Sequence, residues 1–423
     1  MSVFRVGSNK SSVNNFPTVR PTLDLDFANS KTLDPRITFT RASGGSYVGA
    51  DGLIKYAGVN EARFDHDPET GESLGLLIEE GRTNLVQDSE DVFKYSIKVK
   101  TNYSLNQIVA PDGTTTADKI YNDTTTGEHY IEDVLSSGLS GNFTHSVFVK
   151  AAEYTKVVLR PVHIGESTNT SGCTFDLSNE TATTPGGIGS NASIQKFPNG
   201  WYRISMTLTL TGANTSNAFR LHLRENESSI LNYTGDGTSG FYIWGAQVEA
   251  GSFPTSYIPT QGSTRTRQRD DVVITGKNFS DFYRQDEGTV FVDSGLEPSA
   301  YVPFQAYLSF TGSTTFDEIR IWRNNLTQAT VNHLVGNVSQ GAINFPISPA
   351  SNRIASSYSI AQGISVSANG GAISSANLSA TVPATRIRIG ARANNTFYGN
   401  RTYKRITFWP QRLPDSTLKA ITR

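Results

Sequence analysis

The sequence is poor in cysteine, in methionine and in long apolar runs. Its 423 residues include one cysteine, Cys173, so no disulfide can form within the chain and a cysteine-based metal cluster is excluded. Two methionines and few blocks of strong helix formers leave little material for long helices. No run of about 18 apolar residues occurs, and Met1–Arg5 lacks the apolar centre of a signal peptide. We therefore expect neither a standard export signal nor membrane insertion.

The chain also lacks an excess of positive or negative charge. The chain has 37 basic and 38 acidic residues, a formal net charge of −1, which gives no reason to expect nucleic-acid binding. The charges are unevenly distributed, however. Eleven acidic and three basic residues lie between Asp51 and Asp91, whereas nine basic residues and one acidic residue lie between Arg386 and Arg423.

Motifs for catalysis or metal binding are scarce. The six histidines are scattered without an H-E-x-x-H pair, and no nucleophile elbow or phosphate loop occurs, so we expect no catalytic residues, no metal and no cofactor. Asp65, Asp67 and Glu69 alternate in a Pro-Gly turn that superficially resembles a calcium loop. The turn lacks the twelve-residue ligand spacing of that loop, which favours a solvated turn and leaves calcium binding open.

Glycine, turn residues and alternating apolar positions dominate instead. There are 37 glycines and 10% aromatic residues, as in proteins of short strands joined by turns, so we predict an all-β fold. Phe219, Leu221 and Leu223 alternate with polar residues, the pattern of a strand with one wet face. Strands of this kind from 86 to 260 predict a two-sheet jelly roll. The four tryptophans of the chain, Trp201, Trp244, Trp322 and Trp409, lie in predicted strands and are expected in the core rather than on a sugar.

Several stretches together resemble a known family. Ser73–Leu85 reads SLGLLIEEGRTNL, Leu23–Phe27 and Asp34–Ser43 precede it, and Trp244–Gly251 and Pro254–Thr260 follow it. This ordered set is similar to landmarks of bacteriophage virion fibre and spike proteins. The resemblance covers roughly residues 23 to 270 and implies a virion protein made in the host cytoplasm.

Two further resemblances concern the sandwiches. The strands of 86–260 are similar in order to carbohydrate-binding-module sandwiches. After a charged connector at 261–271, the unit 272–423 resembles concanavalin-like or laminin-G-like lectin sandwiches, because its last strand is followed by proline and a short helix. The predicted organisation is tandem β-sandwiches, jelly roll then concanavalin-like, preceded by a short-stranded region at 23–85 and an extended anchor at 1–22.

The family resemblance implies a non-enzymatic tail or head fibre or spike protomer that binds host envelope polysaccharide during adsorption. Residues 1–22 are expected to attach the chain to an adaptor protein of the virion head or tail, and a homotrimer is expected because such fibres are commonly three-fold. Two alternatives remain: a glycan-cleaving spike, and a capsid-decorating protein that does not bind the host.

The basic C-terminal stretch supplies the candidate glycan-binding residues. Strand alternation directs Ile387 and Ile389 to the core and Arg386 and Arg388 to the surface. In the last strand the same parity places Lys404, Ile406 and Phe408 on one face and Tyr403, Arg405 and Thr407 on the other, which adds Arg405 to the exposed set. Arginine binds the anionic groups of bacterial envelopes in bidentate fashion. The alternative is that these cations pair with the acidic stretch 51–91.

Overall fold

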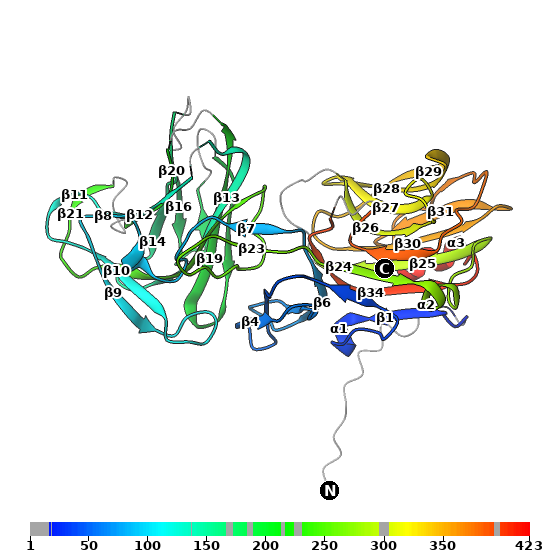
Figure 1. Cartoon of the computed structure of the whole chain (residues 1–423), viewed down its shortest axis with the longest axis horizontal. Coiled ribbons are helices and arrows are strands. Elements are labelled where there is room, and N and C mark those ends of the chain that lie inside the picture. The colour runs from blue at the N-terminus through cyan, green and yellow to red at the C-terminus, as the bar shows by residue number, and fades with distance from the viewer. Residues whose placement is uncertain are drawn as a thin grey trace, which may run out of the picture.

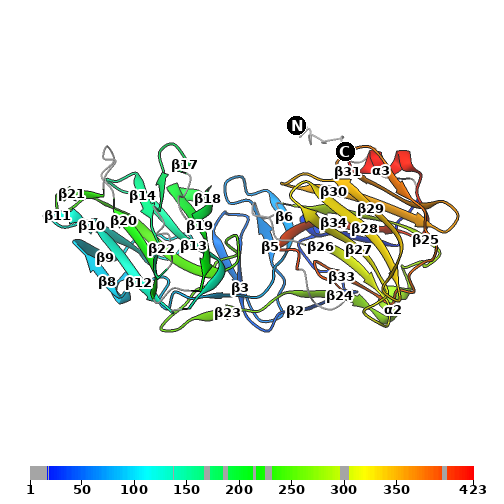
Figure 2. The same cartoon turned by 90° about the horizontal axis from the view of Figure 1, so that it is seen from above.

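The computed structural model describes residue 17 and residues 19–136, 138–165, 172–183, 189–212, 216–223, 231–295, 304–392 and 398–423. These residues form two β-sandwich lobes that lie side by side along the longest axis (Figures 1 and 2). A small hairpin, β3 (Gly45–Val48) and β4 (Ile54–Ala57), lies between the lobes on one side. The predicted all-β fold with tandem sandwiches is confirmed.

The C-terminal lobe is built from two antiparallel sheets. The first contains, in spatial order, β32 (Ser374–Ala376), β31 (Gly363–Ala368), β30 (Asn352–Ser359), β25 (Glu287–Ser294), β34 (Arg401–Trp409), β6 (Ser73–Ile78) and β5 (Phe64–His66), with β1 (Leu23–Asp26) also beside β34. The second contains β2 (Thr38–Thr40), β24 (Asp271–Thr275), β33 (Arg386–Ile389), β26 (Gln305–Thr311), β27 (Glu318–Asn325), β28 (Gln328–Val335) and β29 (Val338–Pro346). Their inner faces share one apolar core, which includes Leu76, Ile387 and Phe408.

The other lobe, which corresponds to the predicted jelly roll, also has two main sheets. One contains β18 (Gly189–Lys196), β19 (Trp201–Thr211), β13 (Ser140–Ala151), β22 (Gly240–Ala250), β10 (Ala117–Asn122) and β9 (Thr101–Ile108). The other contains β17 (Thr181–Ala182), β16 (Cys173–Asp176), β14 (Lys156–Leu159), β20 (Ser216–Leu223), β12 (Tyr130–Leu135) and β8 (Ile97–Val99), with β15 (Val162–Ile164) also beside β20. A small ribbon pairs β11 (Thr126–Glu128) with β21 (Asn232–Thr234). Phe219, Leu221 and Leu223 are buried, as the alternation predicted, but His222 on the face expected to be wet is fully buried as well.

Helices are short in the described part of the chain, and none has the length and apolar character needed to cross a bilayer. They are α1 (Phe27–Ser30), α2 (Gly276–Ser280) and α3 (Asp415–Ile421), with 3-10 turns at Val92–Lys94 and Pro198–Gly200. The apolar side of α3 packs on the outer face of the first sheet, where Leu418 meets Trp409. All four tryptophans are buried, as expected.

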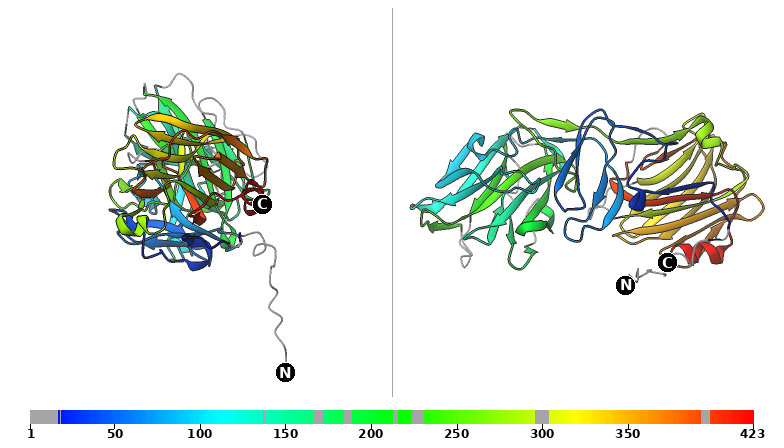
Figure 3. Two further views of the ribbon diagram at one scale, coloured as in Figure 1. Left: turned by 90° about the vertical axis from the view of Figure 1, so that its right-hand side faces the viewer. Right: turned by 90° about the horizontal axis from the view of Figure 1, so that it is seen from below.

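The strand pairing revises the predicted domain organisation. Residues 23–85 are not a region of their own, because β1 and β6 both pair with β34 and β2 pairs with β24. The apolar run of β6 is buried in the sandwich, and side chains on both faces of the strand are shielded from solvent. The C-terminal lobe therefore needs strands from both ends of the chain, and the jelly-roll lobe is inserted between them. Figure 3 shows the N-terminal strands running into the C-terminal lobe.

Candidate functional site

Two short strands carry the chain between the lobes. β7 (Arg82–Asn84) leaves the C-terminal lobe and β23 (Arg265–Arg267) returns to it, and the two pair antiparallel with Arg82 opposite Arg267. A side-chain hydrogen bond of 2.7 Å joins Thr83 Oγ1 to Thr266 Oγ1. We call this pair of strands the joint. Two paired strands restrict the relative motion of the lobes more than a single connecting chain could.

Three of the stretches singled out in the sequence, 73–85, 244–251 and 254–260, meet at the joint. Asn84 is fully buried, and its amide donates to the carbonyls of Ala246 and Ile258 at 3.0 and 2.9 Å. Its Oδ1 accepts from the backbone N–H groups of Val86 and Val248, both at 3.1 Å. The RTNL segment is thereby fixed to the two landmarks that come about 160 residues later in the chain. These stretches, which are far apart in the sequence, therefore pack against one another in the folded chain.

A buried ion network lies beside the joint. It consists of Arg41, Arg63, Glu79, Arg267 and Asp270. The Arg63 guanidinium pairs with Glu79 at 2.7 Å and with Asp270 at 2.5 Å, and Arg41 pairs with Asp270 at 3.1 Å. We call these five residues the joint network.

The state of Glu79 shows how the joint network is balanced. Burial of Glu79 disfavours its charged form, but the guanidinium groups of Arg267 and Arg63 and hydrogen bonds from Ser256 outweigh burial and lower its pKa to about 2. Glu79 belongs to the GLLIEEG landmark, and Ser256 belongs to the PTSYIPT landmark. These landmark residues therefore stabilise the joint.

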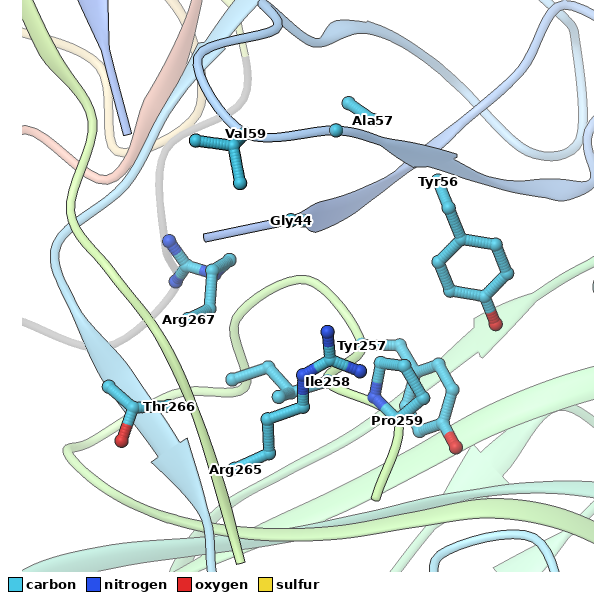
Figure 4. Close-up of a pocket in the computed structure, with 12 residues that line it drawn as sticks. Gly44, Tyr56, Ala57, Val59, Tyr257, Ile258, Pro259, Arg265, Thr266 and Arg267 are labelled. Atoms are coloured by element: carbon cyan, nitrogen blue, oxygen red, sulfur yellow. The ribbon is translucent and has the colours of Figure 1, made fainter. Parts of the chain in front are cut away.

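A cavity of about 570 Å³ opens between the joint and the β3–β4 hairpin (Figure 4). Small-molecule sites commonly have volumes of about 300 to 1,000 Å³ and often lie between domains. Tyr56 and Val59 come from the hairpin side, and Ile258 and Arg265 come from the joint side. We call it the joint cavity.

The lining of the joint cavity is apolar and aromatic, with two arginines. Tyr56 is 48% exposed and Val59 is 63% exposed, although both are large side chains that usually seek burial. Arg265 and Arg267 lie two residues apart on β23, so both reach the same side of the strand. Arg265 is exposed, whereas Arg267 is 1% exposed. The lining residues include no Asp, Glu or His.

The structure does not bring the predicted glycan-binding arginines together. Arg386 and Arg388 lie on β33, on the outer face of the second sheet, whereas Arg405 lies on β34 of the first sheet. Outer faces of the two sheets of a sandwich point in opposite directions. Arg388 pairs with Asp271 at 2.7 Å, and Arg405 pairs with Asp24 at 2.5 Å. The three residues therefore do not form one binding site.

The parity argument for β34 was partly wrong. A bulge leaves Lys404 without an opposite residue, because Tyr403 lies opposite Ser294 and Arg405 lies opposite Asp293. Tyr403 therefore joins Ile406 and Phe408 in the core, whereas simple alternation placed it on the outer face with Arg405. Lys404 pairs with Glu72 at 2.6 Å, so one contact between the basic end and the acidic stretch does form.

The three acidic residues of the calcium-like turn do not converge. Asp65 accepts from the Val48 N–H at 2.7 Å, and Asp67 accepts from the N–H groups of Glu69 and Thr70 inside its own turn. Glu69 lies 3.5 Å from Lys196. Among the described residues, no group of three or more histidine, cysteine or acidic side chains is placed to hold a metal ion.

Tyr56 and Arg265 were not singled out from the sequence. Tyr56 lies in a short hairpin with no motif, and Arg265 lies in a stretch that we interpreted as a connector. The T-R-T-R alternation at 264–267 was the available signal, since it is the period-2 pattern of a strand. The alternation indicates the strand β23, but it does not show that the β3–β4 hairpin lies opposite this strand.

No protein-family model matches this chain, and no curated protein matches it. Among solved structures, the CBM40 module of Ruminococcus gnavus IT-sialidase is 16% identical and aligns with 33% of this chain and 83% of that one, with a TM-score of 0.29. The same module bound to α2,3-sialyllactose gives 15% identity, the same shares of both chains and a TM-score of 0.27. Domains LG4–5 of the mouse laminin α1 chain are 9% identical over 68% of this chain and 85% of that one, with a TM-score of 0.20. None of these likenesses carries an argument about function.

Proposed function

We propose that the chain is a non-enzymatic protomer of a bacteriophage virion appendage, a fibre or spike, and that it binds host-surface carbohydrate in the joint cavity. The observation that carries the binding proposal is the exposed Tyr56 ring facing Arg265 across a cavity of about 570 Å³. An aromatic face suits the apolar side of a sugar ring, and a guanidinium supplies several fixed hydrogen-bond donors. The resemblance of residues 23–270 to virion proteins supports the appendage part of the proposal.

Binding is favoured over cleavage by the chemistry of the joint cavity. Most glycoside hydrolases use a pair of carboxyl groups that flank the scissile bond. The lining residues of the joint cavity contain no carboxylate. A glycan-cleaving spike would therefore need a second site elsewhere on the chain.

The binding test uses the full-length protein and polysaccharide purified from host cells. Wild type is expected to retain the polysaccharide in a biosensor assay, and Val59→Trp is expected to reduce binding strongly because the larger indole takes up part of the space that a sugar ring would need. The control is Val338→Trp, which enlarges another exposed side chain, on β29 of the C-terminal lobe. Equal binding by Val59→Trp and wild type would contradict the proposed site.

The same polysaccharide separates the alternatives. Release of new reducing ends by the pure protein would support the glycan-cleaving spike. A virion-bound protein that neither binds nor cleaves the polysaccharide would support the capsid-decorating role.

A homotrimer follows from the family resemblance, and the edges of the jelly-roll lobe are compatible with assembly. β9 lies at the edge of its sheet, and its eight residues, TNYSLNQI, carry no charge and no proline. Natural edge strands usually carry such features to block pairing with another chain. Sedimentation at micromolar concentration is expected to give three times the chain mass of 46.0 kDa. A folded protein that sediments as a monomer would contradict the trimer.

The virion adaptor is proposed to bind the N-terminal segment 1–22. Residues 1–16 and 18 lie outside the described residues. Farther along, the Val19 carbonyl accepts from Trp409 Nε1 at 3.1 Å, and Thr22 Oγ1 donates to the Phe282 carbonyl at 2.8 Å. Deletion of residues 1–16 keeps both contacts and is expected to leave a folded protein that no longer enters particles. Normal copy number of the truncated protein on purified virions would locate the anchor elsewhere.

A further inference from the structure

We infer that the ligand of the joint cavity is an acidic sugar whose carboxylate is bound by the Arg265 guanidinium. This inference rests on the proposed function, because it names the chemical class of the carbohydrate that enters the same cavity. It draws on the position of Arg265, on the charge of the joint network behind the cavity and on the composition of the lining.

Arg265 is available to a ligand. It is exposed on β23, and Figure 4 shows its guanidinium extending into the joint cavity near Tyr257 and Pro259. A neighbouring hollow that Arg265 also lines contains four acidic residues, Asp88, Glu90, Asp91 and Asp118. Within the described residues, no carboxylate lies within ion-pair distance, 4.0 Å, of the Arg265 guanidinium. Its donors can therefore bind a ligand without first breaking an ion pair.

Arg267 adds positive charge at the back of the joint cavity. It lines the cavity with 1% of its surface exposed, and none of its three guanidinium nitrogens has a hydrogen-bond partner. Its ionic contact is Glu79, 3.5 Å away and shared with Arg63. A guanidinium with unsatisfied donors is a persistent source of positive potential in a poorly hydrated site.

The joint network as a whole has one positive charge in excess. Its three guanidinium groups, on Arg41, Arg63 and Arg267, face the two carboxylates of Glu79 and Asp270, so three minus two leaves one. The adjacent Glu249 carboxylate and Arg203 guanidinium add one charge of each sign and leave this excess unchanged. Charges buried in protein are screened much less than charges in water. The Arg267 side of the joint cavity therefore favours an anion over a neutral ligand of the same shape, whereas the charges of Glu90 and Asp112 act on the Tyr56 side.

The composition of the lining favours one carboxylate over a polyanion. Tyr56, Val59 and Pro259 give a largely apolar surface that suits a sugar ring, and a single exposed guanidinium stands beside it. Arginine binds a planar carboxylate through two parallel hydrogen bonds. A chain of closely spaced sulfates or phosphates would need several exposed cations, and the lining offers one.

The test compares three forms of one host-cell polysaccharide by calorimetry on the full-length protein: native, carboxyl-reduced and dephosphorylated. Carboxyl reduction is expected to weaken binding about tenfold or more, since a hydrogen-bonded charge contributes about 1.5 to 3 kcal/mol. Dephosphorylation is expected to leave binding unchanged. Arg265→Gln is expected to bind native and carboxyl-reduced forms with equal affinity, and Arg265→Lys to recover part of the preference. Arg386→Gln, on the far sheet face, is the control and is expected to keep the full preference.

The outcomes separate this inference from the proposed function. If wild type binds native and carboxyl-reduced polysaccharide equally, or if dephosphorylation abolishes binding, the acidic-sugar inference is overturned while carbohydrate binding stands. If Arg265→Gln keeps the preference for the native form, the carboxylate is bound elsewhere. If no form binds, the proposed function itself fails.

Discussion

The Arg63 guanidinium donates to the Asp270 carboxylate across 2.5 Å, and neither side chain is exposed to solvent. The two residues are 207 positions apart, and the whole jelly-roll lobe lies between them in the sequence. Their contact holds together the segment before the jelly-roll lobe and the segment after it. Glu79 and Ser256, which belong to the stretches 73–85 and 254–260, support this contact, because Ser256 donates to Glu79 and Glu79 pairs with Arg63.

Arg63→Leu is expected to destabilise the protein by about 3 to 5 kcal/mol, because it removes the guanidinium that bridges two buried carboxylates. Asp270 would keep its ion pair with Arg41, and Glu79 would keep its longer ion pair with Arg267. Chemical denaturation followed by fluorescence measures the change. The control is Lys277→Ala, which removes an exposed pair with Asp281 and is expected to cost about 0.5 kcal/mol or less. Equal midpoints for Arg63→Leu and wild type would show that the joint network does not stabilise the fold.

Asn84→Asp is expected to loosen the joint while preserving the shape of the side chain. The substitution keeps the acceptor for Val86 and Val248 but replaces the amide that donates to the carbonyls of Ala246 and Ile258. A buried unsatisfied polar group costs about 1 to 3 kcal/mol. Faster proteolytic cleavage between the lobes is the expected readout, with Gln87→Ala, at an exposed side chain shortly after the same strand, as the control. Resistance equal to wild type would contradict the role of Asn84.

His333→Leu is expected to make the fold less sensitive to acid. Burial lowers the pKa of His333 from 6.5 to about 3, so between those values the unfolded chain takes a proton that the folded chain does not. Folding stability therefore falls as pH drops from about 6.5 toward 3, and above that range His333 contributes nothing. The variant should lose less stability than wild type between pH 7 and pH 4 in urea unfolding. An unchanged pH dependence would mean that His333 does not titrate in this way.

Tyr56→Ala is expected to weaken polysaccharide binding about tenfold or more without changing the melting temperature, because the ring is half exposed and packs little of the core. Tyr56→Phe keeps the ring and is expected to keep most of the affinity. Binding isotherms with one polysaccharide preparation compare the three proteins. Equal loss of binding in Tyr56→Ala and Tyr56→Phe would assign the effect to the hydroxyl group and contradict stacking.

The fold class was predictable because it depends on local pattern. Alternation along β20 and β33 placed Phe219, Ile387 and Ile389 in the core correctly. Simple alternation failed at Tyr403, where a bulge inserts one residue into β34, and a bulge leaves no reliable mark in a single sequence.

The domain organisation and the site were less predictable, since both depend on contacts between distant segments. The pairing of Leu25 with Ile406 and of Leu77 with Thr402 joins the two ends of the chain, and no local pattern encodes it. The same holds for Tyr56 and Arg265, which come from segments about 200 residues apart. The basic C-terminal stretch was visible in the sequence, but its arginines are divided between two sheets.

The central claim is that host carbohydrate binds in the joint cavity. A crystal structure of the protein with an oligosaccharide prepared from the host envelope tests it most directly. The predicted result is a sugar ring against Tyr56 with an acidic group on Arg265. A sugar bound instead over Arg386 and Arg388 on the outer face of the second sheet, with the joint cavity empty, would contradict the account.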